Sequence, residues 1–364
     1  MMHGILQAAK AANISRAPKY NLLVCFDAFE TLYAPKEPVH KTYGQFARDN
    51  GLQHASDHVV AVYLHDRITK AAKEYPNYGK HIQGMNPEAW WMKVIKNIFV
   101  DVEPSLRDAA HKAQLDDLGR RLFHHFSTRD AYKTASNMPK LLQSLKHHSK
   151  SNSSTMDKPS SIGHVVLGVI SNSDDRVGGI LSSLGLDVSP LRFQRESKQD
   201  THFESARPVD GKSYDVDFTV MSYDVEESKP HKLMWQAGEM LARRAVVHEL
   251  GRFDESVPWL KLYVGDDIKK DIESAWGCGW NAVLLKEFIT ENPRDERLES
   301  LDEEEMLAKP VTEVLAGHSP RMFTVNRLET LVDWIVKRGL EVSAGSDGSA
   351  NHSEERFKLV KSME

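Results

Sequence analysis

Residues 21–32 read NLLVCFDAFETL, and the rest of the chain can be organised around this stretch. Its apolar run, LLVCF, lacks the alternation of a half-buried strand, which predicts a strand buried on both faces of a parallel sheet. Asp27 follows directly, at the point where such a strand would end. In open α/β sheets, ligands bind just beyond the carboxyl ends of the strands. Asp27 is therefore either a reactive or metal-binding carboxylate or an ordinary aspartate that caps a turn.

The length, composition and net charge of the chain limit the classes of protein to which it can belong. The chain has 364 residues, of which 40% are hydrophobic and 27% are charged, and this composition predicts a soluble globular protein of one large domain or two ordinary ones. A net charge of −5 gives no basic surface for nucleic acid or for an anionic membrane. No apolar run approaches the roughly 20 residues that a membrane-spanning helix needs. We expect no nucleic-acid partner and no membrane span, and no pattern indicates the oligomeric state.

Cysteine usage and the first residues bear on the compartment. Cys25 and Cys278 both lie in apolar segments without the spacing of zinc ligands, which indicates buried thiols in a reducing, intracellular compartment. We expect the cytoplasm first and the nucleus as a further compartment. Residues 1–20 contain no acidic side chain, which is also compatible with a mitochondrial presequence, although a flexible N-terminus is the simpler interpretation.

A block of helical patterns follows the first strand. Residues 33–150 carry apolar side chains at helical spacing and no strand-like pattern. Within this block, Asn86 followed by Pro87 predicts the start of a helix, because asparagine is a good cap and proline is tolerated at the first helical position. Trp90 and Trp91 come next, and two adjacent tryptophans cannot both face the core. We expect one of them to line a cleft between this block and the rest of the chain.

Strand and helix patterns alternate after residue 160. Four further strands are predicted at residues 165–170, 217–223, 260–264 and 282–285. Their alternation with helical patterns predicts parallel βαβ units and therefore a Rossmann-like core. Because the helical block separates the first strand from the others, the predicted fold is α/β with a helical cap inserted after the first strand.

These patterns divide the chain into a core, a cap and connecting or terminal stretches. The predicted boundaries are 21–35 and 160–342 for the α/β core, 36–150 for the cap, 151–161 for a Ser-rich linker, 1–20 for a flexible N-terminus and 343–364 for a disordered tail. Two polar stretches, 189–213 and 290–315, interrupt the core as insertions, and the sequence does not indicate their role.

Polar residues stand at the ends of three of the predicted strands. Asp27 follows the first strand, Ser171 and Asn172 the second, and Asp266 and Asp267 the fourth. Because the carboxyl ends of parallel strands meet at one edge of a sheet, we expect these side chains to lie together. Taken singly, each pattern is more often a turn or a helix cap than a site. Their common order and strand context favour a site.

Two further residues complete a candidate phosphoryl-transfer site. Lys229 precedes a helix after the third strand, and Asp271 lies five residues beyond Asp266. In such a site a carboxylate attacks phosphorus, while a lysine and a hydroxyl group neutralise the charge on the phosphate oxygens. Mg²⁺ prefers few protein carboxylates together with water and substrate oxygens, and Asp27 with Asp266 would supply them. The set predicts Mg²⁺ as cofactor and a small phosphorylated substrate as partner.

These segments resemble the four motifs of the haloacid dehalogenase-like hydrolase superfamily. The matching segments are residues 26–32 (FDAFETL), Ile170-Ser171-Asn172, Lys229-Pro230, and Val264-Gly265-Asp266 with Asp271. The helical block resembles a cap of that superfamily, and the segments that resemble one of its subgroups are Tyr75-Pro76-Asn77-Tyr78-Gly79, Gln83-Gly84 and Trp90-Trp91. The resemblance covers residues 20–342.

The resemblance implies a nucleophile and a set of metal ligands. Asp27 would be the nucleophile and would form an aspartyl-phosphate during hydrolysis of a small phosphorylated metabolite. Mg²⁺ would be bound by Asp27, Asp266 and the backbone carbonyl of Phe29.

The resemblance also implies how the phosphate is held. Ser171, Asn172 and Lys229 would bind it. Asp267 and Asp271 would support Lys229 or the metal shell. A cap of this kind closes over the site, so small substrates are favoured over phosphorylated proteins.

Phe29 departs from the pattern of the superfamily's phosphatases. In those enzymes the residue two positions after the nucleophile is a second aspartate, which acts as general acid and base, and a phenyl ring cannot transfer protons. Losing such catalysis typically slows a reaction about 10²–10⁴-fold. Glu30 is the nearest acid. Adjacent side chains on an extended backbone point in opposite directions, so we do not expect Glu30 to take over.

Three interpretations follow. The first is a phosphatase-type hydrolase that is slow because Phe29 replaces the general acid. The second is a catalytically degenerate member that binds a ligand or another protein. The third is a dehalogenase, because dehalogenases of the superfamily carry an aromatic residue at the position of Phe29. Gly265-Asp266-Asp267 is a metal-binding arrangement that a dehalogenase does not need, so dehalogenation ranks last.

Overall fold

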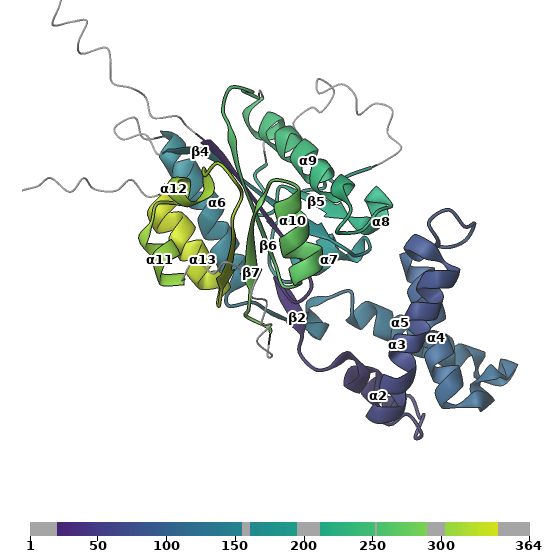
Figure 1. Cartoon of the computed structure of the whole chain (residues 1–364). Coiled ribbons are helices and arrows are strands. Elements are labelled where there is room, and N and C mark those ends of the chain that lie inside the picture. Colours follow the sequence, from purple (N-terminus) through teal and green to yellow (C-terminus); the bar gives the residue numbers. More distant parts are fainter. Residues whose placement is uncertain (1–19, 155–160, 195–211, 252, 290–302, 341–364) are drawn as a thin grey trace, which may run out of the picture.

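A six-stranded parallel sheet forms the centre of the computed structural model, which describes residues 20–154, 161–194, 212–251, 253–289 and 303–340 (Figure 1). The strand order is β5-β4-β1-β6-β7-β8. The bounds are β1 Tyr20–Phe26, β4 Ile162–Ser171, β5 Phe218–Met221, β6 Trp259–Gly265, β7 Asn281–Leu285 and β8 Met322–Val325. The predicted α/β fold with a Rossmann-like sheet is confirmed.

Strand β1 lies in the middle of this sheet because its side chains are apolar on both faces. It pairs with β4 on one side and with β6 on the other, so that Val24 lies opposite both Leu167 and Leu262. Leu22 and Val24 pack against one face of the sheet, and Cys25 packs against the other. The carboxyl end of β1 therefore lies between those of β4 and β6, where ligands bind in such sheets.

Helices cover both faces of the sheet (Figure 1). Buried side chains of α6, α7, α12 and α13 pack on one face, and those of α9 and α10 pack on the other. The bounds are α6 Met138–Ser154, α7 Arg176–Ser183, α8 Ser222–Val225, α9 Lys232–Leu250, η7 Ile268–Glu273, α10 Ser274–Gly277, α11 Glu303–Ala308, α12 Val311–Leu315, α13 Leu328–Ile335 and η8 Val336–Leu340. Gly251 ends α9 as predicted, with a left-handed φ of 69°.

A helical insertion follows β1, as predicted, and occupies the lower right of Figure 1. Its elements are β2 Tyr33–Pro35, α2 Val39–Asp49, α3 Asp57–Glu74, η1 Pro76–Gly79, α4 Pro87–Val102, η2 Pro104–Arg107, η3 Ala109–His111, α5 Lys112–His125, η4 Arg129–Ala131 and β3 Tyr132–Thr134. Helices α2 to α5 share an apolar cluster of their own. Asn86 caps α4 as expected, because its Oδ1 accepts a hydrogen bond from the backbone N–H of Ala89 at 2.8 Å.

Three strands were not predicted. β2 and β3 form an antiparallel pair in which Tyr33 lies opposite Thr134, and the expectation of no strand in residues 33–150 is wrong for both. Each of these two strands has only 3 residues, which is too short to show an alternating pattern. β8 has 4 residues and escaped notice for the same reason.

Helix α6 packs with the sheet rather than with α2 to α5. Leu142 and Leu145 are completely buried in the cluster that contains side chains of β1 and β4. Residues 138–150, expected in the cap, thus pack with the core, and α6 continues to Ser154 within the stretch expected as a linker. The domain boundaries themselves stay predictions.

Several predicted segments lie outside the described residues. These are the flexible N-terminus except Tyr20, the tail at 343–364, residues 155–160 of the linker, and residues 195–211 and 290–302 of the two insertions. The described remainder of the second insertion forms α11 and α12, whose Met306 and Val311 are completely buried against the sheet. Among the described helices, none is both long and apolar enough to cross a membrane.

Substitution of Gly168 tests the packing of the sheet centre. A Cβ atom at this position would lie 2.3 Å from Cζ of Phe218 and 2.9 Å from Sγ of Cys25, and both neighbours are completely buried. We expect Gly168→Ala to lower the free energy of unfolding in urea by about 1–3 kcal/mol. Gly178 in α7 is the control, because a Cβ atom there would meet nothing within 4 Å and alanine favours a helix. An equal loss in both variants would contradict this packing.

Candidate active site

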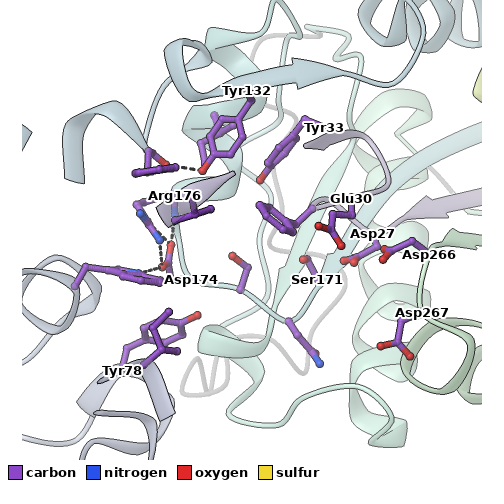
Figure 2. Close-up of a pocket in the computed structure, with 18 of the residues that line it drawn as sticks. Asp27, Glu30, Tyr33, Tyr78, Tyr132, Ser171, Asp174, Arg176, Asp266 and Asp267 are labelled. Atoms are coloured by element: carbon purple, nitrogen blue, oxygen red, sulfur yellow. Dashed lines mark hydrogen bonds and ion pairs between the residues drawn. The ribbon is translucent and has the colours of Figure 1, made fainter. Parts of the chain in front are cut away.

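A cavity of about 520 Å³ lies at the carboxyl edge of the sheet, lined jointly by strand ends and by the helical insertion (Figure 2). Its charged lining residues are Asp27, Glu30, Asp174, Arg176, Lys229, Asp266, Asp267, Lys270 and Asp271. All of these come from the segments that follow strands or start helices of the core. The cavity is therefore where the chemistry predicted from the strand ends would take place.

The strand ends converge as the sequence predicted. The lining of this one cavity includes every residue selected from the sequence, namely Asp27, Phe29, Ser171, Asn172, Lys229, Asp266, Asp267 and Asp271. Their convergence is confirmed, whereas their individual roles stay predictions.

Lys229 is buried between two carboxylates. Its Nζ lies 2.9 Å from Oδ1 of Asp27 and 2.6 Å from Oδ1 of Asp271, and it donates a hydrogen bond to the hydroxyl of Tyr263 at 2.9 Å. Only 1% of the lysine side chain is exposed. Burial lowers the pKa of Lys229, but the charges of Asp27 and Asp271 outweigh burial and hold this pKa above its usual value. The ammonium group is thus charged at neutral pH.

Asp271 ties Lys229 to the loop that follows β6. Its Oδ2 accepts hydrogen bonds from the backbone N–H groups of Asp266 and Asp267, at 3.2 and 3.0 Å. Gly265 permits this close approach, because a Cβ atom there would lie 2.5 Å from Cγ of Asp271. Both carboxylate oxygens of Asp271 are thereby engaged, which suits the supporting role expected for it.

Asn172 holds the backbone of Lys229. Its Oδ1 accepts a hydrogen bond from the backbone N–H of Lys229 at 2.6 Å, and its Nδ2 donates to the backbone carbonyl of Lys229 at 3.0 Å. The amide group predicted to bind phosphate is thus engaged in positioning the lysine. Ser171, at the end of β4, is 3% exposed and lines the cavity beside it.

Asp266 has a raised pKa. Burial, followed by the negative charges of Asp27 and Asp271, raises the pKa of Asp266 to about 7. Thr31 acts in the opposite direction, because its Oγ1 donates a hydrogen bond to Oδ1 of Asp266 at 2.9 Å. Thr31 was not selected from the sequence, since nothing there shows that it faces Asp266 across 235 residues of chain.

The acidic cluster fits a divalent cation. One oxygen from each of Asp27, Asp266 and Asp271 lies within 4.8 Å of the others. Oδ1 of Asp27 is buried and, beyond its ion pair with Lys229, has no hydrogen-bond partner among the described groups. A buried oxygen whose contact in the described part of the chain is Lys229 alone and a neighbouring carboxyl with a raised pKa are both features that a cation between Asp27 and Asp266 would stabilise.

Phe29 and Glu30 lie next to Asp27 on the cavity wall. The ring of Phe29 is 41% exposed and meets Tyr33 edge to face at 6.4 Å between centroids. Glu30 has a left-handed φ of 59°, so the backbone here is not extended, and both residues line the same cavity. The extended backbone that we assumed for this pair is therefore wrong. Figure 2 shows Glu30 on the same side of the cavity as Asp27 and Asp266.

No protein-family model matches the chain, but similar proteins are known. A putative uncharacterized hydrolase of Schizosaccharomyces pombe is 26% identical over 260 residues, which are 71% of this chain and 88% of the relative. Haloacid dehalogenase-like hydrolase domain-containing protein 3 of Danio rerio is 26% identical over 290 residues, 77% and 93% of the two chains. The chain is thus similar to proteins named as hydrolases of the haloacid dehalogenase-like type.

One solved structure is similar over most of both chains. The 2-haloacid dehalogenase from Pseudomonas syringae pv. Tomato DC3000 has 18% sequence identity and a TM-score of 0.46, over 87% of this chain and 98% of that chain.

A hydrogen bond from Trp91 joins the cap to an ion pair of the core, and the sequence revealed neither contact. Arg176 donates from Nε and an Nη atom to the two oxygens of Asp174, at 2.9 and 2.8 Å, and Trp91 Nε1 donates to Asp174 at 2.8 Å (Figure 2). Trp91 thus lines the cavity while Trp90 is 4% exposed inside the cap cluster, which confirms the expectation for this pair. No local pattern links positions as far apart as Trp91 and Asp174.

Removing the charge of Asp266 should stabilise the metal-free protein at neutral pH. The folded chain keeps a proton on Asp266 up to about pH 7, whereas an unfolded chain releases it near ~3.9. The folded state binds more protons between these values, so stability falls as the pH rises. We expect Asp266→Asn to raise the melting temperature in EDTA by about 2–4 °C at pH 8, with a smaller gain at pH 5.

Asp267→Asn is the matched control for this prediction. Burial raises the pKa of Asp267, but hydrogen bonds from Lys270 outweigh burial and hold it below its usual value. The charge of Asp267 therefore stabilises the protein at neutral pH, and its removal should not raise the melting temperature at pH 8. Equal gains in the two variants, or a gain for Asp266→Asn that is larger at pH 5, would show that repulsion at Asp266 is absent.

Proposed function

We propose that the chain is a phosphatase-type hydrolase that depends on Mg²⁺ and cleaves a small phosphorylated molecule through Asp27. The observation that carries this proposal is the placement of Asp27 beside the buried ammonium group of Lys229, with Ser171 in the same cavity. A carboxylate next to a fixed positive charge and a hydroxyl group suits attack on a phosphate, whose oxygens carry the developing charge.

Asp27, Asp266 and the backbone carbonyl of Phe29 would hold the metal ion. Mg²⁺ bound there would supply positive charge that draws phosphate oxygens toward Asp27 and stabilises them in the transition state. Such a charge is needed because negative groups outnumber positive ones in the lining. Apart from the Asp174–Arg176 pair, the lining contains two lysines, Lys229 and Lys270. It contains five carboxylates, which are Asp27, Glu30, Asp266, Asp267 and Asp271. A phosphate dianion would be repelled from this end of the cavity without a cation.

Lys229 and Ser171 would bind the phosphate oxygens. The ammonium group of Lys229 is fixed by Asp27 and Asp271, and its backbone is fixed by Asn172. A donor that is already oriented loses little freedom when the charge develops, which is the condition for electrostatic catalysis. Asn172 and Asp271 would act in this scheme through Lys229.

The reaction would proceed in two displacements at phosphorus. In the first, a bond forms between a carboxylate oxygen of Asp27 and phosphorus, and the ester P–O bond breaks, so that the leaving oxygen departs with the electron pair. In the second, water attacks phosphorus, the bond to Asp27 breaks, and inorganic phosphate and the free carboxylate are formed. The leaving oxygen takes its proton from solvent in the first step, because Phe29 carries none.

A binding protein without turnover is the second candidate, and Phe29 is the observation that favours it. The same geometry would then hold a phosphorylated ligand or present the cap to a partner. Dehalogenation ranks third, because the acidic cluster around Asp266 suits a cation that dehalogenation does not need.

Hydrolysis of 4-nitrophenyl phosphate tests the proposal directly. We expect Mg²⁺-dependent turnover, or a burst that stalls, for the wild-type protein, because nitrophenolate leaves without a proton. Asp27→Asn should abolish both while keeping a cooperative melting transition. Equal rates of hydrolysis for wild type and Asp27→Asn would contradict the role of Asp27. If neither protein hydrolyses the ester but Mg²⁺ and vanadate still raise the melting temperature, the binding candidate would be favoured.

Phe29→Asp tests the consequence of the missing acid. The ring of Phe29 is 41% exposed, so a smaller polar side chain can replace it without a buried void. We expect phosphate release from alkyl phosphates to rise by about 10²–10⁴-fold, the usual contribution of general acid and base catalysis. Phe29→Leu is the control, since leucine transfers no proton. Comparable rates for all three proteins would mean that Phe29 is not the limiting residue.

A further inference from the structure

The two ends of the cavity differ in chemistry. The strand-end side carries all the charged groups of the lining. On the cap side, every lining residue between positions 39 and 132 is aliphatic or aromatic, and none of these described residues is charged. Phe29 continues this apolar surface up to Asp27. A ligand that places its phosphate at Asp27 therefore places the rest of its structure against apolar side chains.

We call the apolar lining residues between positions 39 and 132 the cap wall. The charged groups nearest to it, Asp174 and Arg176, are already paired with each other. Arg176 is matched by Asp174 through two hydrogen bonds, and its guanidinium group lies 4.9 Å from the ring centroid of Trp91 and 5.1 Å from that of Phe123. The indole N–H of Trp91 is used by Asp174, and the hydroxyl of Tyr132 donates to a backbone carbonyl at 2.9 Å. The indole N–H of Trp91 and the hydroxyl hydrogen of Tyr132 are thus engaged within the protein rather than offered to a ligand.

Such a wall disfavours a polyol. Each hydroxyl group that loses water without gaining a partner weakens binding, and a sugar phosphate would bring several. Tyr33, Tyr43 and Tyr78 add hydroxyl groups to the lining, which can pair with isolated polar substituents. An aromatic body gains instead from the surrounding rings and from the removal of its apolar surface from water. The volume of about 520 Å³ lies within the range of sites that take a ring-sized ligand.

The absence of an acidic side chain at position 29 is a second, independent reason to expect an aromatic ligand. An alkoxide needs a proton as it leaves, and its conjugate acid has a pKa close to that of water, about 15.7. A phenolate is the conjugate base of an acid with a pKa of about 10, like that of tyrosine, and leaves without one. A site with Phe29 beside its nucleophile is thus matched to aryl esters and poorly matched to alkyl esters.

We infer that the substrates are small phosphate monoesters of aromatic alcohols rather than sugar or polyol phosphates. This inference rests on the proposed function and names its substrate class. The bond that breaks joins phosphorus to the aryl oxygen. The aryl oxide departs with the electron pair and takes a proton from solvent, and Asp27 receives the phosphoryl group before water releases it.

Binding of inert phosphonates separates recognition from catalysis. We would measure the affinity of the full chain, with Mg²⁺, for 1-naphthylmethylphosphonate and for methylphosphonate by calorimetry. The aryl compound should bind at least about tenfold more tightly, because one buried apolar group accounts for that ratio. Equal affinities would overturn the inference, whether or not the chain hydrolyses anything. Selective binding without hydrolysis of any ester would uphold the ligand class and count against the proposed catalysis.

A wall variant and a substrate panel complete the test. Ile68 lines the cavity from α3 and is half-buried, so Ile68→Gln introduces a polar group at modest cost to folding, and Ile68→Leu is its control. Ile68→Gln should weaken binding of the naphthyl compound several-fold and leave the affinity for methylphosphonate unchanged. Ile68→Leu should change neither affinity. In the panel, kcat/KM for 1-naphthyl phosphate should exceed that for glucose 6-phosphate and glycerol 3-phosphate. Equal or better turnover of the polyol esters would overturn the inference while leaving the phosphatase proposal intact.

Discussion

The buried ammonium group of Lys229 is the feature on which the rest of the site depends. A buried charge is stable only when it is paired and hydrogen-bonded, and Asp27 and Asp271 supply that pairing from the end of β1 and from η7. Asp271 in turn holds the backbone of the 266–267 loop, and Asn172 holds the backbone of Lys229. One ion pair network thus fixes three strand ends relative to one another. The same network leaves Asp27 and Asp266 close together, with a repulsion that a divalent cation relieves.

The division of labour between core and cap follows from this network. The core brings together the charges because parallel strands end at one edge, and it does so whatever the cap contains. The cap then needs only to enclose the other end of the cavity, and it does so with rings and aliphatic side chains around the Asp174–Arg176 pair. Phe29 lies at the carboxyl edge of the sheet, close to Asp27, but its side chain is apolar like those of the cap that line the cavity. A substrate that suits both the charged end and the apolar end of the cavity would need no proton from the protein at the step where its ester bond breaks.

The sequence predicted the parts of the molecule in which local pattern and topology coincide. Apolar runs that end in Asp27, Ser171 and Asp266 identified parallel strands and the edge where they meet, and the helix cap at Asn86 followed from residue chemistry alone. It failed where the relevant contact is distant or the segment too short: the strand pair β2–β3, strand β8, the packing of α6 on the sheet and the contact of Trp91 with Asp174. The conformation of Glu30 was missed because a left-handed φ in a glutamate has no sequence signal. The cap wall is apolar because of the way the cap helices are rotated about their axes, which decides the side chains that face the cavity. Amino-acid composition does not reveal that rotation.

The central claim is that Asp27 carries the phosphoryl group during turnover. The most direct measurement is to quench the protein in acid during hydrolysis of an aryl phosphate, reduce it with borohydride and map its peptides by mass spectrometry. An acyl phosphate is reduced to the alcohol, so we predict homoserine at position 27 and unchanged aspartate at positions 266, 267 and 271. Turnover without any reduced residue, or reduction at a carboxylate other than that of Asp27, would contradict it.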